Sequence, residues 1–133
     1  MAVTITNSTI EALNTVTEVT RSLATVDTDN STEVFTFTPT VSGGKLLIVF
    51  VNDNLLQSDA ANNDSTFSIA AGDFAYGAAA ITGTVTVDKV ECIQVETVRV
   101  LQDDGTVAIT MTPGTDDKLT ADNALAITVY ELL

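Results

Sequence analysis

Gly-Gly-Lys-Leu-Leu-Ile-Val-Phe-Val-Asn-Asp, residues 43–53, is the stretch that decides the fold. Its middle part, residues 46–51, is an unbroken apolar run that is rich in β-branched and aromatic side chains and too short for a typical helix. The glycine pair before this run and the Asn-Asp pair after it supply turn chemistry at both ends. The pattern predicts a central strand, buried on both faces, around which the other strands build the core.

The rest of the chain has the composition of one all-β domain. Hydrophobic residues make up 45% of its 133 residues, and Val, Ile and Thr dominate. Because β-branched side chains lose rotamer freedom in helices and pack well on pleated sheets, this composition favours strands. A chain of this length can bury a core without a disulfide or a metal ion. We therefore expect a single domain over residues 1–133.

Alternation of apolar and polar residues locates the surrounding strands. The expected strands are residues 3–6, 16–23, 33–38, 66–69, 81–87, 90–100, 106–112 and 124–131. Turn signals separate them at about the 8–12-residue spacing of a sandwich. The prediction is a single antiparallel β-sandwich, jelly-roll-like, with a closed β-barrel as the alternative. Residues 1–10 are expected to form an extended N-terminal arm.

Three local patterns predict departures from plain strands. Residues 8–11, Ser-Thr-Ile-Glu, match a helix capping box and predict a single helical turn. The apolar parity shifts between Val95 and Val98, which predicts a β-bulge near Glu96. Residues 103–105, Asp-Asp-Gly, are a hairpin-turn signal leading into the strand at 106–112.

The strong negative charge of the chain limits its possible partners. Eighteen Asp and Glu against five Lys and Arg give a formal charge of −13, with a sequence pI near 4.1. Such a surface repels nucleic-acid phosphates and anionic lipids, so we expect neither as a partner. No apolar run approaches the roughly 20 residues of a membrane helix. The N-terminal residues lack the basic and apolar regions of a secretory signal, which predicts synthesis in the cytoplasm.

Side chains for common catalytic chemistry are scarce. The sequence has no histidine, which removes Ser-His-Asp and Cys-His systems. The single Cys92 excludes an internal disulfide, and its strand-like context predicts a small buried hydrophobe. Glu91 and Glu96 could act as an acid–base pair only if a bulge brought them to one face of their strand. We expect no enzymatic activity.

Acidic loops raise the question of calcium. Carboxylates gather at residues 27–29, 59–64, 103–104 and 116–122. None of these loops has the spacing of an EF-hand, and turn chemistry alone accounts for acidic turn residues. We expect no cofactor, with Ca²⁺ as the alternative.

Apolar side chains at loops and chain ends are the candidate contacts with a partner. The candidates are Leu55, Leu56, Phe74, Tyr76, Leu132 and Leu133. Phe74 and Tyr76 lie among alanines and glycines, where no strand requires them. Such groups either fold back over one end of a sandwich or contact another subunit or protein.

Several segments resemble small virion proteins encoded by phages. They are residues 35–40 (FTFTPT), 44–49 (GKLLIV), 67–74 (FSIAAGDF), 96–100 (ETVRV), 104–109 (DGTVAI) and 126–133 (AITVYELL). Taken together, their layout is most similar to the capsid decoration, or cement, proteins of tailed phages. That resemblance implies a β-rich structural protein on the head exterior, bound to the lattice of the major capsid protein. It also implies a homo-oligomer, with a trimer favoured, made in the host cytoplasm.

Two other functions are also compatible with the sequence. One is a carbohydrate- or receptor-binding β-sandwich of a tail or cell surface. The other is a subunit of a filament or surface layer, in which residues 2–6 would link neighbours by strand exchange.

Overall fold

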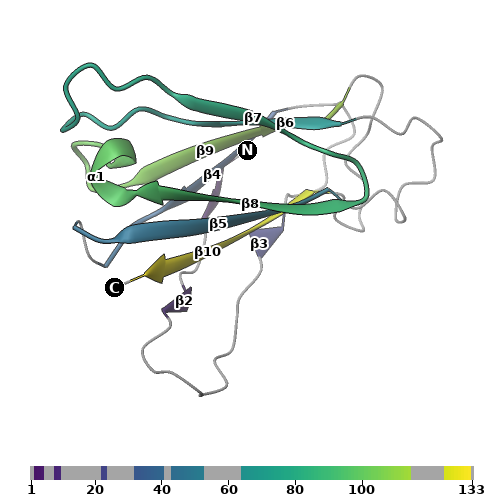
Figure 1. Ribbon diagram of the computed structural model, residues 1–133, viewed down its shortest axis with the longest axis horizontal. Helices are drawn as coiled ribbons and strands as arrows, with labels where there is room; N and C mark the ends of the chain where they lie inside the picture. Colours follow the sequence, from purple (N-terminus) through teal and green to yellow (C-terminus); the bar gives the residue numbers. More distant parts are fainter. Residues whose placement is uncertain are drawn as a thin grey trace.

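The computed structural model describes residues 2–4, 8–9, 22–23, 32–40, 43–52, 64–114 and 125–132, and it describes side chains from residue 32 onward. Two sheets pack face to face (Figure 1). Sheet A has the order β1 (Ala2–Thr4), β4 (Glu33–Phe37), β9 (Val107–Thr112), β6 (Ser65–Ile69) and β7 (Ile81–Val85). Sheet B has the order β2 (Ser8–Thr9), β10 (Leu125–Leu132), β5 (Lys45–Asn52) and β8 (Lys89–Glu96), and β3 (Ser22–Leu23) also pairs with β10.

The topology confirms an antiparallel β-sandwich. From β4 to β10 the chain passes from one sheet to the other at every connection except the β6–β7 hairpin. Pairing is antiparallel apart from β1 with β4 and β2 with β10. The alternative of a closed barrel is wrong, because each sheet ends in its own edge strands and the two sheets do not join. The core lies between the layers, where both inner faces meet.

The central strand is β5, which pairs with β10 on one side and β8 on the other. Leu46, Ile48 and Phe50 point into the core and are fully buried. The prediction of burial on both faces is wrong for the other side chains of the run, since Val49 and its outward-facing neighbours are only half-buried. The packing of the two layers buries the inner face of β5, while its outer face is only partly covered.

The core fills from alternate positions of every long strand, as the sequence pattern predicts. Phe50 of sheet B stacks on Phe67 of sheet A, with ring centroids 4.3 Å apart. Besides Phe50, the fully buried apolar side chains include Phe35 and Phe37 of β4, Val107, Ile109 and Met111 of β9, and Leu125, Ile127 and Val129 of β10. These are the residues expected to face inward.

The N-terminal residues partly match their predictions. The expected strand at residues 3–6 is confirmed at residues 3 and 4, which belong to β1 and pair with β4. The helical turn expected at residues 8–11 is wrong at its first two residues, because Ser8–Thr9 is a strand paired with β10. A strand expected over residues 16–23 is described only at Ser22–Leu23. The remaining residues of both predictions lie outside the described part of the chain.

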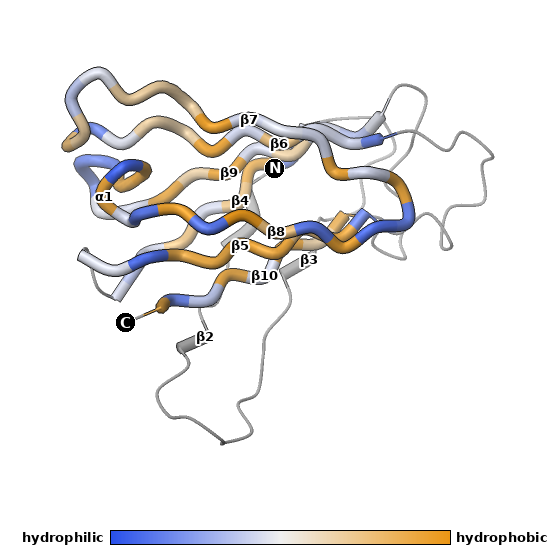
Figure 2. The backbone as a smooth tube through the Cα atoms, in the orientation of Figure 1, coloured by the Kyte–Doolittle hydropathy of each residue, from blue (hydrophilic) through white to orange (hydrophobic). Residues whose placement is uncertain are grey.

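The stretch after β8 overturns two predictions. β8 pairs with β5 without interruption from Lys89 to Glu96, so the bulge near Glu96 is wrong. Figure 2 shows the alternation of hydrophilic and hydrophobic residues along this strand. The parity shift marks instead a single helical turn, α1 (Thr97–Val100). Residues 103–105 do form a tight turn, but β8 and β9 lie in different sheets and make no hairpin.

Candidate functional site

Among the described residues, two of the large exposed apolar side chains lie on the aromatic loop, residues 70–80, which joins β6 to β7. Phe74 is 61% exposed and Tyr76 is fully exposed. Gly77 follows with φ of 73°, and the Ala78 N–H donates to the Ala75 carbonyl at 2.9 Å. This turn places both aromatic rings on the surface, outside the core cluster.

Backbone hydrogen bonds fix the aromatic loop to the turn formed by α1 and the residues after it. The Gly72 N–H donates to the Arg99 carbonyl at 2.8 Å, and the Asp73 N–H donates to the Leu101 carbonyl at 3.0 Å. A side-chain bond adds to these, because the Gln102 side-chain amide donates to the Ala71 carbonyl at 2.7 Å. Main-chain bonds of this kind reduce the backbone entropy that the loop would lose on binding.

Gly72 makes this close approach possible. A Cβ at this position would lie 2.7 Å from the Leu101 carbonyl oxygen and 2.9 Å from the Arg99 carbonyl carbon. Both neighbours are backbone atoms, which cannot move aside as a flexible side chain can. Only glycine therefore allows the loop and the α1 turn to lie against each other.

An acidic turn next to the aromatic loop is stabilised by its own side chains. The Asp73 carboxylate accepts the Asp103 N–H at 2.8 Å. The Asp104 carboxylate accepts the Thr106 hydroxyl at 2.7 Å and the Thr106 N–H at 2.9 Å. These bonds, the hydroxyl bond first, lower the pKa of Asp104 below its ordinary value of 3.8 because they favour the ionised carboxylate.

The Asp104 bonds predict a specific pH dependence. A lowered folded-state pKa means that the contribution of the charge is complete above pH 3.8 and is lost as pH falls through the folded-state value. Asp104→Asn keeps an acceptor oxygen but no charge. We expect wild type to exceed this variant in stability at pH 7, and the difference to shrink toward pH 3, in urea unfolding. A difference that stays constant over this range would contradict the assignment.

The predicted contact residues fall into three groups. Phe74 and Tyr76 are exposed, as a contact surface requires. Leu132 is half-buried at the end of β10, opposite Lys45. Leu55, Leu56 and Leu133 lie outside the described residues.

Two exposed apolar residues were missed by the sequence reasoning. Val98 is 46% exposed on α1, and Val90 is 67% exposed on β8. The parity shift at Val98 is the available signal, and it fits a bulge as well as the helical turn that forms. Nothing in the sequence shows that β8 is an edge strand, which is what exposes Val90.

The side chains considered for catalysis, Glu91, Glu96 and Cys92, do not come together in one site. Glu91 faces inward and Glu96 outward on a regular strand, so the two carboxylates lie on opposite faces of sheet B. Glu91 accepts the Thr86 N–H and the Thr86 hydroxyl, both at 3.1 Å, which gives it a structural role. Cys92 is exposed, and the prediction of a buried thiol is wrong. Its outward position on an edge strand is the reason.

A second carboxylate with a structural role is that of Glu131 on β10. It is buried, and it accepts the Thr40 N–H at 2.8 Å together with the Thr40 hydroxyl. These bonds tie residue 40, beyond the end of β4, to sheet B and so connect the two layers.

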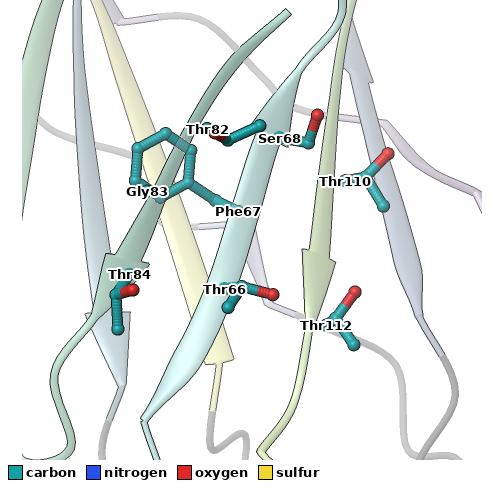
Figure 3. Close-up of a pocket in the computed structure, with 8 residues that line it drawn as sticks. All are labelled: Thr66, Phe67, Ser68, Thr82, Gly83, Thr84, Thr110 and Thr112. Carbon is teal, nitrogen blue, oxygen red and sulfur yellow. The ribbon is translucent and has the colours of Figure 1, made fainter.

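The outer face of sheet A carries rows of hydroxyl groups. Figure 3 shows Thr66, Ser68, Thr82, Thr84, Thr110 and Thr112 on the neighbouring strands β7, β6 and β9. Register places Thr84, Thr66 and Thr112 in one row and Thr82, Ser68 and Thr110 in the next. The hollow over these rows measures about 350 Å³ and has no titratable side chain in its lining. The lining of this hollow therefore offers hydrogen bonds but no carboxylate, amine or thiol group.

Neither a cluster of potential metal ligands nor a membrane-spanning helix occurs in the described part of the chain. Within those residues no group of three or more Cys, Asp or Glu side chains could hold a metal ion. Of the acidic loops considered for calcium, residues 27–29 and 116–122 and most of 59–64 lie outside the described ranges. No helix among the described residues is long and apolar enough to cross a membrane.

Comparison of the chain with protein-family models, with curated proteins and with solved structures finds no match. The functional argument therefore rests on the residues and on the geometry of the aromatic loop.

Proposed function

We propose that this protein is a non-enzymatic structural protein that binds a repeating protein surface through the aromatic loop. The observation that carries the proposal is the pair Phe74 and Tyr76, exposed on a loop that backbone bonds hold in place. Large aromatic side chains with few rotatable bonds are typical anchors of protein interfaces. An aromatic pair fixed at one end of a sandwich supports docking better than it supports catalysis.

The repeating surface that we propose is the lattice of a major capsid protein on the outside of a tailed-phage head. The sequence resemblance to decoration proteins supports this choice. The charge of −13 supports it as well, because a strongly acidic protein is repelled by packaged DNA and suits the outer side of a shell. Many copies, each with a modest contact, would together stabilise the shell through mass action.

Binding to shells tests the proposal directly. The probe is purified heads of a tailed phage whose genome encodes this chain, assembled without it, and the assay is co-sedimentation. Wild type is expected to bind, and the double variant Phe74→Ala/Tyr76→Ala to lose about 30-fold or more in affinity, as for interface anchors worth about 2 kcal/mol or more.

A matched control comes from the outer face of sheet A. Thr66→Ala/Thr84→Ala alters two exposed, paired residues toward the end of the β6–β7 hairpin that lies away from the aromatic loop, and it should bind like wild type. Absence of wild-type binding would refute the capsid assignment. Unchanged binding by the aromatic double variant would refute the role of the loop.

A further inference from the structure

The two long sides of the sandwich are built differently. On one side, short strands from the first 23 residues cover the edges: β1 borders β4 in sheet A, and β2 and β3 border β10 in sheet B. On the other side the edges are β7 and β8, which follow each other in the chain and face each other across the core (Figure 1). Within the described ranges, no strand pairs with the outer edge of either one.

Register defines which backbone groups of β8 are available. The Thr97 N–H donates to the Gly44 carbonyl at 3.0 Å, so this pair is hydrogen-bonded. Bonded and non-bonded pairs alternate along an antiparallel ladder, and β8 pairs with β5 without a break. The backbone groups of Val90, Cys92, Gln94 and Glu96 therefore point away from β5. A regular edge strand of eight residues with four such positions is a template for a further strand.

The core is open along this edge. A groove of about 430 Å³ runs between the sheets, lined by Phe50, Phe67, Thr84, Glu91, Cys92 and Ile93. Phe67 and Ile93 pack on the core but are only half-buried. Val90 on the outer face is 67% exposed. A strand added to β8 would bury these apolar groups and pair the free backbone.

The charges on β8 indicate which strand could pair with it. In a chain of net charge −13, like-charge repulsion opposes contact between copies. The outward positions Val90, Cys92 and Gln94 are uncharged, and Glu96 at one end lies opposite Lys45 of β5. Lys89 is at the other end. An antiparallel pair of β8 strands brings the Lys89 end of each copy beside the Glu96 end of the other, and the uncharged outward positions between these ends add no repulsion.

We propose that two copies associate by antiparallel pairing of β8 with β8 about a twofold axis perpendicular to sheet B. Such an axis keeps the inner faces of the two copies of sheet B on the same side of the joined sheet. Even-numbered residues of one β8 strand therefore lie opposite even-numbered residues of the other. Cys92 then lies opposite its own counterpart or opposite Gln94. The two copies of sheet B form one continuous sheet, and the groove closes. The product is a dimer, which differs from the trimer that the resemblance implies.

Sedimentation equilibrium over a range of protein concentrations, in reducing buffer, tests the pairing. Wild type is expected to show a monomer–dimer equilibrium that tightens with added salt, because salt screens the repulsion between two acidic molecules. Cys92→Pro removes one outward N–H while leaving the β5 ladder intact, and it should weaken the dimer at least about tenfold. Cys92→Ser keeps the backbone donor and should associate like wild type.

A second variant and a chemical reporter complete the test. If Cys92→Pro does not fold, Cys92→Glu places two like charges near the axis without changing the backbone and adds to the negative charge of both copies, so it should also give monomers. A short bismaleimide should join the two Cys92 thiols of wild type at concentrations where the dimer forms. Monomeric wild type at all concentrations, a trimer, or a folded Cys92→Pro or Cys92→Glu that dimerises like wild type would overturn the proposal. None of these outcomes depends on binding to capsids.

Discussion

Replacing Phe50 by alanine is expected to cost about 3–5 kcal/mol of folding free energy, the range for deleting a buried phenylalanine. Phe50 is 1% exposed on the central strand and stacks on Phe67 of the opposite sheet. The substitution removes both the buried apolar area and the aromatic contact between the two sheets. This loss is a large fraction of the roughly 5–15 kcal/mol that stabilises a typical domain.

Chemical unfolding and thermal melts measure this effect. The expected fall in melting temperature is roughly 10–20 °C for a chain of this size. Phe74→Ala is the matched control, since it deletes the same side chain where it is 61% exposed. The control should change stability by no more than about 0.5 kcal/mol. Equal effects of the two substitutions would contradict the assigned core.

Replacing Gly72 by alanine is expected to separate the aromatic loop from the α1 turn. The new Cβ would lie under 3.0 Å from three backbone atoms of Arg99 and Leu101, so at least one strand connection must shift. Overpacking of this kind costs about 1–3 kcal/mol. The bonds from the Gly72 and Asp73 N–H groups would lengthen or break.

Hydrogen exchange at the residue 72 and 73 amides reports this local change. We expect faster exchange at both amides in the variant, together with weaker binding by Phe74 and Tyr76 because their loop is no longer held. Gly43→Ala is the control, because nothing lies within 4 Å of a Cβ there and φ is not positive. Unchanged exchange in Gly72→Ala would mean that the close approach is not required.

The strands and the inner face of most of them were predictable because alternation is a local property. Phe35 and Phe37 share one face of β4, and Leu125, Ile127 and Val129 share one face of β10, as their spacing requires. The aromatic loop was predictable too, since Phe74 and Tyr76 stand apart from any strand pattern. The bonds that hold it to Arg99 and Leu101 were not, because those residues lie more than 20 positions away.

Failures arose where one pattern is compatible with two structures. The parity shift at Val98 fits a bulge or a helical turn, and the turn forms because the chain leaves sheet B at Thr97. Residues 103–105 fit a hairpin or a connection between sheets, and only strand pairing distinguishes them. The pattern around Cys92 fits either a buried or an exposed strand position. Its outward place on the edge strand β8 makes the thiol exposed.

The sequence by itself determined the all-β class, the positions of the long strands and the side chains that face the core, because the two-residue period of a strand and the chemistry of turns act over a few neighbouring residues. The tertiary structure alone decided which strands are central and which are edges, since that depends on pairings between distant segments. The exposed side of β8 and the anchoring of the aromatic loop both follow from those long-range pairings, and so do the two surfaces proposed for binding.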